Sequence, residues 1–162
     1  MVRFSEYTKP MEKKYSYKVL KSSDVPLMKD LLTVFGQAFD DEEMYQKNTP
    51  SDIYLQTQLD DKNCVVIAAL KENAVVGGLI AYVLPKLEQE KSEIYLYDLA
   101  VDENYRLQGI ATQLIEELKR VGKEIGAWVI FVQADRVDEP AIKLYESLTQ
   151  HKEDPFHFDI LI

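Results

Sequence analysis

Cysteine and histidine are scarce in this sequence, which has one Cys and two His among 162 residues. The single cysteine, Cys64, excludes an intrachain disulfide and a cysteine-based zinc site, and its apolar neighbours indicate a small buried side chain. His151 and His157 have no partner at the i,i+4 spacing that metal ligands on a helix use. The sequence therefore predicts no metal site.

Basic residues are also in deficit, because 19 Lys and Arg stand against 28 Asp and Glu, which gives a formal charge of −9. Attraction to phosphates requires clustered Lys and Arg, so we expect neither a nucleic-acid partner nor an anionic membrane surface. A charge of this sign suits a cationic partner instead.

Long apolar runs are missing as well. The longest one without a charge, 74–84, contains two glycines and is about half as long as a helix that spans a bilayer. The first residues, MVRFSEYTKPMEKK, contain no apolar core of signal-peptide length. We therefore expect a soluble, cytoplasmic protein.

No repeat or linker divides the chain, so we predict a loose tail over 1–14 and one domain over 15–162. Apolar periodicity gives the order β-α-α-β-β-β-α-β-α-β, an α/β layer with mixed strand directions. The expected strands are 15–20, 64–70, 75–84, 93–101, 128–132 (with Trp128 in the core) and a closing strand over 156–160. The expected helices run from N-cap residues 22–24 to about 39, from just after 51, over 109–125 and from 139, with a polar connector over 40–48.

The segment 98–111 is the most informative one, because an apolar strand enters a loop whose glycine opens a long helix. Amides at the start of a helix have no intrahelical acceptor, and the helix dipole favours an anion there. Gly109 and the small Ala111 would let a phosphate approach the backbone closely. The alternative is a plain turn between strand and helix.

Arg106-x-x-Gly109-x-Ala111 resembles the coenzyme A signature of GNAT acyltransferases, (Gln/Arg)-x-x-Gly-x-(Gly/Ala), and 98–101 resembles that family's fourth strand. The order of elements is also similar to the GNAT fold. A narrower resemblance, to type I aminoglycoside 3-N-acetyltransferases, is carried by residues 81–86, 92–95, 97–101, 108–112, 132–135 and 157–160. The sequence departs from that pattern at Thr149, where such proteins usually have glycine after Leu148.

The resemblance implies a single-domain GNAT fold, with a mixed central sheet flanked by helices and two strands splayed at an acetyl-CoA cleft. It places pantetheine along the backbone of the fourth strand, the pyrophosphate on the amides of 107–111, and an oxyanion near the Leu99 N–H. Arg106 would pair with a phosphate or make an ion pair within the loop. The implied acetyl-CoA residues are Leu99, Ala100, Val101, Arg106, Leu107, Gln108, Gly109, Ile110 and Ala111.

Two residues are candidates for proton transfer. Tyr145 matches the family's tyrosine that protonates the departing thiolate, although it also belongs to an apolar helix stripe and could serve packing alone. Asp98 interrupts an apolar strand and is our candidate for the base that accepts a proton from the amine. The alternative for Asp98 is a structural carboxylate.

The resemblance implies a cationic acceptor, acetylated at the 3-amino group of an aminoglycoside by direct attack on the thioester. Asp135 and Asp159 are expected to clamp this substrate. Glu93 either joins them or is a solvated charge on its strand, and Tyr97 either lines the cleft or packs within its strand. The acidic run 40–43 either reaches over the acceptor site or is a solvated loop. Open alternatives are a polyamine or other small amine as acceptor, and a non-catalytic acyl-CoA-binding module. We also expect that the protein forms a homodimer and has a role in antibiotic resistance.

Overall fold

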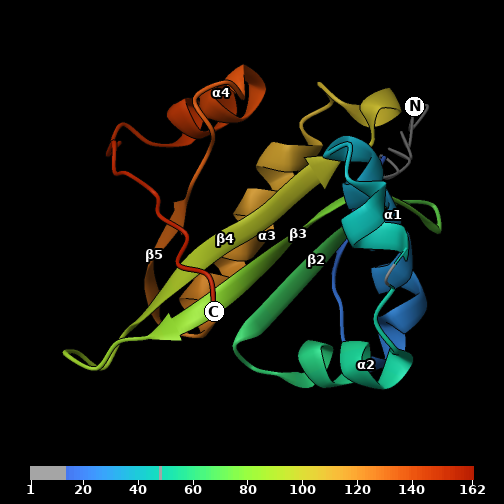
Figure 1. Cartoon of the computed structure of the whole chain (residues 1–162), viewed down its shortest axis with the longest axis horizontal. Coiled ribbons are helices and arrows are strands. Elements are labelled where there is room, and N and C mark those ends of the chain that lie inside the picture. Colours follow the sequence, from blue (N-terminus) through green and yellow to red (C-terminus); the bar gives the residue numbers. More distant parts are fainter. Residues whose placement is uncertain (1–13, 48) are drawn as a thin grey trace, which may run out of the picture. The chain divides into compact units, whose positions relative to one another are not determined.

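The computed structural model describes residues 14–47 and 49–162 (Figure 1). The chain forms two compact units, one up to Val132 and one over Gln133–Ile162, and each is described by itself. The expected tail 1–14 lies outside the described residues except for Lys14.

The first unit is built on one mixed sheet. Its strands are neighbours in chain order: β1 (Ser16–Val19), β2 (Cys64–Lys71), β3 (Ala74–Pro85), β4 (Ser92–Val101) and β5 (Ala127–Val132). Each pair among β1 to β4 is antiparallel, whereas β5 is parallel to β4. A parallel pair requires a crossover, which α3 (Ile110–Glu124) supplies. All five strands confirm the sequence prediction to within about two residues.

Helices cover both faces of this sheet (Figure 1). A 3-10 turn, η1 (Ser22–Asp24), leads into α1 (Val25–Ala38), and α2 (Asp52–Asp60) follows, with the Ser51 hydroxyl accepting the Tyr54 N–H at its start. These two helices lie on one face and α3 on the other. All three helices begin close to the predicted positions, and α1 and α3 also end close to them, because capping residues and apolar spacing act locally.

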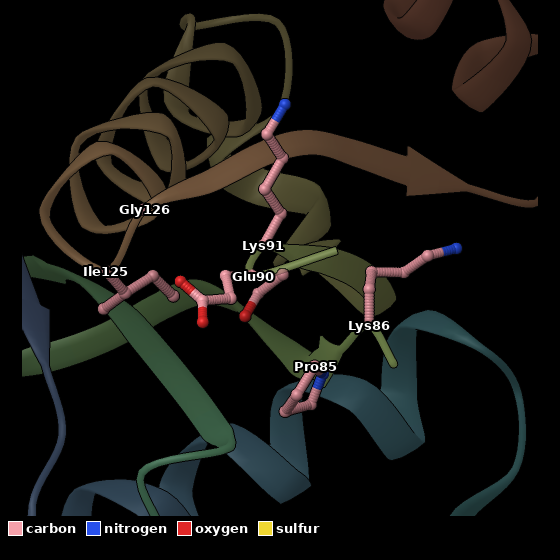
Figure 2. A pocket seen from close by; sticks show the side chains of 7 residues that line it. Pro85, Lys86, Glu90, Lys91, Ile125 and Gly126 are labelled. Atoms are coloured by element: carbon pink, nitrogen blue, oxygen red, sulfur yellow. The ribbon is translucent and has the colours of Figure 1, made fainter. Parts of the chain in front are cut away.

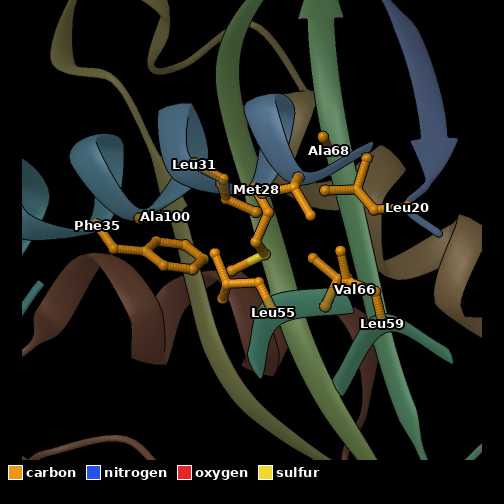
Figure 3. Packing of buried hydrophobic residues seen from close by; sticks show 10 residues of the cluster. Leu20, Met28, Leu31, Phe35, Leu55, Leu59, Val66, Ala68 and Ala100 are labelled. Carbon is orange, nitrogen blue, oxygen red and sulfur yellow. The ribbon is translucent and has the colours of Figure 1, made fainter. Parts of the chain in front are cut away.

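One apolar cluster joins α1, α2 and the sheet (Figure 3). Leu31 and Phe35 of α1 are completely buried in it. Ala100 of β4 belongs to the same cluster, so the carboxyl-terminal half of β4 is held against α1 by hydrophobic packing. The remaining members are Leu20, Val25, Met28, Leu55, Leu59, Val66 and Ala68.

The pairing of β4 changes at its centre. Ile80 of β3 is opposite Asp98, but the next residue, Ala81, is opposite Leu96, so Tyr97 is an extra residue in β4. A bulge of this kind bends the strand and raises its twist. The pairing with β5 ends at the same place, with Leu96 opposite Val132. From Tyr97 onward, none of the strands described by the structure pairs with β4 on the β5 side, which confirms strands that splay apart.

The second unit contains α4 (Glu139–Leu148), which begins as predicted. The Asp138 carboxylate accepts the Ala141 N–H at 3.1 Å and so caps the helix. Arg136 forms an ion pair with Asp154 at 2.6 Å.

Two expectations about secondary structure and burial were wrong, and one segment has a turn that was not predicted. Residues 149–162 contain no strand, because alternation alone does not make one without a hydrogen-bonded neighbour. The polar connector, which the structure describes over 40–47, contains a helical turn, η2 (Glu43–Lys47), of π type that the sequence pattern did not indicate. Trp128 was expected in the core but is 61% exposed.

Among the residues that the structure describes, no helix has the length and apolar character needed to cross a membrane.

Candidate active site

The unpaired half of β4 offers backbone hydrogen-bonding groups. In an antiparallel pair, alternate residues bond to the neighbouring strand. The Asp102 N–H donates to the Val76 carbonyl of β3 at 3.0 Å, and the register below it is regular to Asp98. Leu99 and Val101 are the residues between, so their N–H and C=O groups point away from β3, toward the edge that β5 leaves free. An extended amide-containing ligand could bond there as an added strand.

The loop after β4 ends in an open helix N-terminus. It passes through a 3-10 turn, η3 (Glu103–Tyr105), and then Leu107 and Gly109, whose φ angles are +58° and +79°. Gly109 is the N-cap of α3, its carbonyl accepts the Gln113 N–H at 3.0 Å, and open space lies where its side chain would be. The amides of Ile110 and Ala111 precede the first intrahelical donor. Such a run of outward N–H groups suits a phosphate.

Two side chains fasten this loop to the sheet. The Arg106 Nε–H donates to the Val101 carbonyl at 3.1 Å, and the Tyr15 hydroxyl donates to Gln108 Oε1 at 2.7 Å. Arg106 therefore takes up one acceptor of the free edge and connects the loop to it. Arg106 also borders a cavity of about 290 Å³, which is otherwise lined by Val34, Gln37, Ala38, Asp102, Glu103 and Asn104.

Asp98 lies at the bulge, half-buried, on the face of the sheet that α1 covers. It alternates with Ala100, which belongs to the cluster around Leu31 and Phe35, so both side chains share this face. The Tyr45 hydroxyl oxygen is 3.4 Å from both Asp98 carboxylate oxygens. Burial raises the pKa of Asp98, and the hydrogen bond from Tyr45 opposes that shift. Burial therefore makes this carboxylate a stronger proton acceptor than an exposed one.

An aromatic row extends from this carboxylate across three strands. The Tyr97 ring lies 5.6 Å from Tyr82 and 5.5 Å from Tyr95, and Tyr95 stacks on Phe131 at 4.9 Å between centroids. Tyr97 is 59% exposed. Ring faces beside a carboxylate can bind the apolar face and the charge of a cationic ligand.

The sequence pointed to Tyr97 alone within this row. Tyr82 and Phe131 follow the apolar spacing of their strands. That spacing indicates which face of the sheet a side chain occupies, but not which residues of the neighbouring strand lie beside it. Tyr45 was missed altogether, because it falls in a segment read as a connector.

Three further predicted residues belong to the second unit. Tyr145 is half-buried on α4, where burial and the charge of Asp138 raise its pKa to about 12. The Asp135 carbonyl accepts the Asp138 N–H at 2.9 Å, and Asp159 pairs with His157 at 3.0 Å. That these residues share a site with Asp98 stays a prediction.

Glu93 and Asp41, which belongs to the acidic run, have local structural partners. Glu93 pairs with Lys86 at 3.2 Å, near the end of β4 remote from Gly109. That end borders a pocket of about 290 Å³ between the β3–β4 turn and Gly126 (Figure 2). Within the run 40–43, the Asp41 carboxylate accepts the Met44 N–H at 3.0 Å and so caps η2. In the described part of the chain, no three His, Cys, Asp or Glu gather as metal ligands would.

Comparison with known proteins gives consistent matches. The model of the acetyltransferase (GNAT) family matches residues 27–149. An N-alpha-acetyltransferase from Saccharolobus solfataricus is 34% identical over 95 residues, which are 52% of this chain and 54% of that protein. The chain therefore spans about half the length of the curated relative that it matches.

Two solved structures cover nearly the whole chain. An aminoglycoside acetyltransferase from an uncultured soil metagenomic sample is 47% identical, with a TM-score of 0.90 over 93% of this chain and 99% of that one. A second such enzyme, also from an uncultured soil sample and in complex with sisomicin, is 36% identical, with a TM-score of 0.85 over 92% and 97% of the two chains.

The raised pKa of Asp98 predicts the effect of Asp98→Asn on stability. Because the folded protein disfavours the charged form, ionisation of Asp98 costs stability as pH rises above its unfolded value of about 3.9. The amide of the Asp98→Asn variant does not ionise, so it does not lose stability in this way, and its side-chain oxygen can still accept a hydrogen bond from the Tyr45 hydroxyl. Its melting temperature should therefore exceed that of the parent near neutral pH, and the difference should shrink as pH falls below 4. A difference that does not depend on pH would contradict this explanation.

Proposed function

Since this chain belongs to the GNAT acetyltransferase family, we propose that it is an N-acetyltransferase that uses acetyl-CoA to acetylate an aminoglycoside. The proposed target is the 3-amino group of the cyclitol ring, as the sequence resemblance implies. The observation that carries the proposal is the free edge of β4 at Leu99 and Val101, continuous with the open N-terminus of α3 at Gly109.

The residues of this edge fit acetyl-CoA. The Leu99 carbonyl and the Val101 N–H, which point away from β3, would bond the amides of its pantetheine arm, because the Val101 carbonyl already accepts Arg106. The N–H groups from Leu107 to Ala111 would hold the diphosphate, and Leu107 and Gly109 supply the φ angles that turn them outward. This needs few lysines, which agrees with a chain of net charge −9. When bound, acetyl-CoA supplies an activated acetyl thioester.

Three groups of the chain would then act on the reacting atoms. The Leu99 N–H would donate to the oxygen on which negative charge develops. Asp98 would accept a proton from the acceptor amine, since a protonated amine cannot attack. Tyr145 would give a proton to the departing sulfur, and its raised pKa keeps the phenol protonated at neutral pH.

The acceptor is proposed from charge, from aromatic surface and from the similar proteins. Asp98 and the exposed Tyr97 offer a carboxylate and a ring to a polyamine, and Asp135 and Asp159 are the proposed additional clamps. Two solved relatives are aminoglycoside acetyltransferases. A peptide N-terminus is the second candidate, because one relative is an N-alpha-acetyltransferase.

A steady-state acceptor panel tests this proposal. Thiol release from acetyl-CoA is measured with sisomicin, gentamicin, spermidine and a short peptide, and mass spectrometry locates the acetyl group. We expect the aminoglycosides to have the highest kcat/KM, the acetyl group on the 3-amino position, and a decrease of kcat/KM as salt rises. If only the peptide or only spermidine is acetylated, the proposal of an aminoglycoside acceptor is wrong. Binding of acetyl-CoA without turnover of any amine would indicate a non-catalytic module.

Gly109→Ala should weaken acetyl-CoA binding, and Gly126→Ala is its matched control. Both glycines flank α3, both have positive φ, and both have open space at the Cβ position. Each substitution should therefore cost a similar amount of stability, about 1–2 kcal/mol. Only the methyl group at Gly109 would stand in the way of the diphosphate, so calorimetry should show a loss of roughly tenfold in affinity for that variant alone. Equal affinities of the two variants for acetyl-CoA would contradict the proposal that the diphosphate binds at this helix N-terminus.

Tyr145→Phe should retain acetyl-CoA affinity and lose most of kcat. A positioned general acid contributes roughly 10²–10⁴-fold to a rate, far more than a missing hydroxyl changes through folding. The measurement is kcat with the best acceptor, beside calorimetry with acetyl-CoA. A parental kcat would assign Tyr145 to packing with Ala141, Leu144 and Leu148.

A further inference from the structure

Tyr45 occupies a position that the assigned site does not explain. It lies on η2, in the segment between α1 and α2, and its ring packs against Phe35 at 6.0 Å and Phe39 at 5.7 Å between centroids. Its hydroxyl leaves this apolar contact and reaches Asp98, 53 residues further along the chain. A polar group at the end of a packed ring is held in place by the packing of the ring.

We propose that Tyr45 is a positioning residue whose hydroxyl orients the Asp98 carboxylate and holds it ionised to receive the proton of the acceptor amine. This inference rests on the proposed function, because it assigns to Asp98 the role of base. Asp98 takes one proton from the nitrogen and becomes a carboxylic acid, while the nitrogen keeps the electron pair with which it attacks.

The geometry supports orientation of the carboxylate. The two distances from the hydroxyl oxygen to Asp98 are equal, 3.4 Å each, so the phenol is centred on the carboxylate rather than bound to one oxygen. A carboxylate has about four acceptor positions, and a centred donor leaves an outward lone pair on each oxygen. An amine that approaches from the free edge of β4 would find these lone pairs available.

The electrostatics support retention of the charge. Burial disfavours ionised Asp98, whereas a hydroxyl that donates to the carboxylate favours it. The other titratable groups whose charges act with Asp98 or Tyr45 are Tyr82 on β3, Tyr95 and Tyr97 on β4, and Asp41 before η2. Burial raises the pKa values of Tyr45, Tyr82 and Tyr95, so these phenols remain neutral while Asp98 titrates.

The first test needs no acceptor. Tyr45→Phe keeps the ring contacts and removes the hydroxyl, and Tyr54→Phe, on the exposed side of α2, is the matched control. The carboxyl carbon of Asp98, assigned by its loss in Asp98→Asn, is titrated by ¹³C NMR in each protein. We expect the pKa of Asp98 to rise by roughly 0.5–1 unit in Tyr45→Phe and to stay unchanged in the control. An unchanged titration in Tyr45→Phe would overturn the proposal.

The second test measures kcat/KM against pH. Asp98 must be ionised to act, so the acidic limb should move to higher pH in Tyr45→Phe by the same amount, with the affinity for acetyl-CoA retained. In the Asp98→Asn background, adding Tyr45→Phe should change nothing further. A rate loss that is equal at every pH, or that persists in that background, would show that Tyr45 acts on structure alone. A parent protein that acetylates no amine would instead refute the proposed function, while the NMR titration would still decide whether Tyr45 sets the charge of Asp98.

Discussion

The geometry of the site follows from one constraint, the single extra residue in β4. Tyr97 has no partner in β3, and the register on the two sides of it differs by one residue. The pairing with β5 ends at the same place, with Leu96 opposite Val132, so Leu99 and Val101 have no strand to bond on that side within the described residues. Unpaired groups of this kind are costly if buried and dry, and a ligand backbone satisfies them. The extra residue, Tyr97, directly precedes Asp98, so the bulge lies at the candidate base.

The remaining elements keep this opening in place. Ala100 packs into the cluster under α1, which holds the far end of β4, and Arg106 connects the loop to the Val101 carbonyl. The positive φ of Leu107, a residue with an exposed side chain, is sustained by these attachments rather than by a preference of leucine. Backbone strain of this kind is typical of loops that present amides to a ligand. The free edge of β4 and the loop that follows it are therefore held by the packing of Ala100 and by the hydrogen bond from Arg106.

Much of the site could be predicted from sequence because its parts are consecutive. The strand 98–101, the turn and Gly109 lie within 14 residues, and capping and periodicity act over that range. Asp98 was also detectable, since a carboxylate in an apolar strand has to be satisfied or functional. The closing strand 156–160 could not be predicted in the same way, because alternation gives the face of a segment and not its hydrogen-bonded neighbour.

The sequence by itself determined the order of the five strands and four α-helices, the open helix N-terminus at Gly109 and the acidic balance of the chain, since each depends on neighbouring residues or on composition. The tertiary structure alone decided which tyrosine meets Asp98. Tyr45 lies in a polar stretch whose local pattern indicates a connector, and only the packing of its ring on Phe35 and Phe39 turns its hydroxyl toward β4. A contact between residues 53 positions apart is set by how α1 and η2 pack on the sheet, and no local pattern encodes that distance.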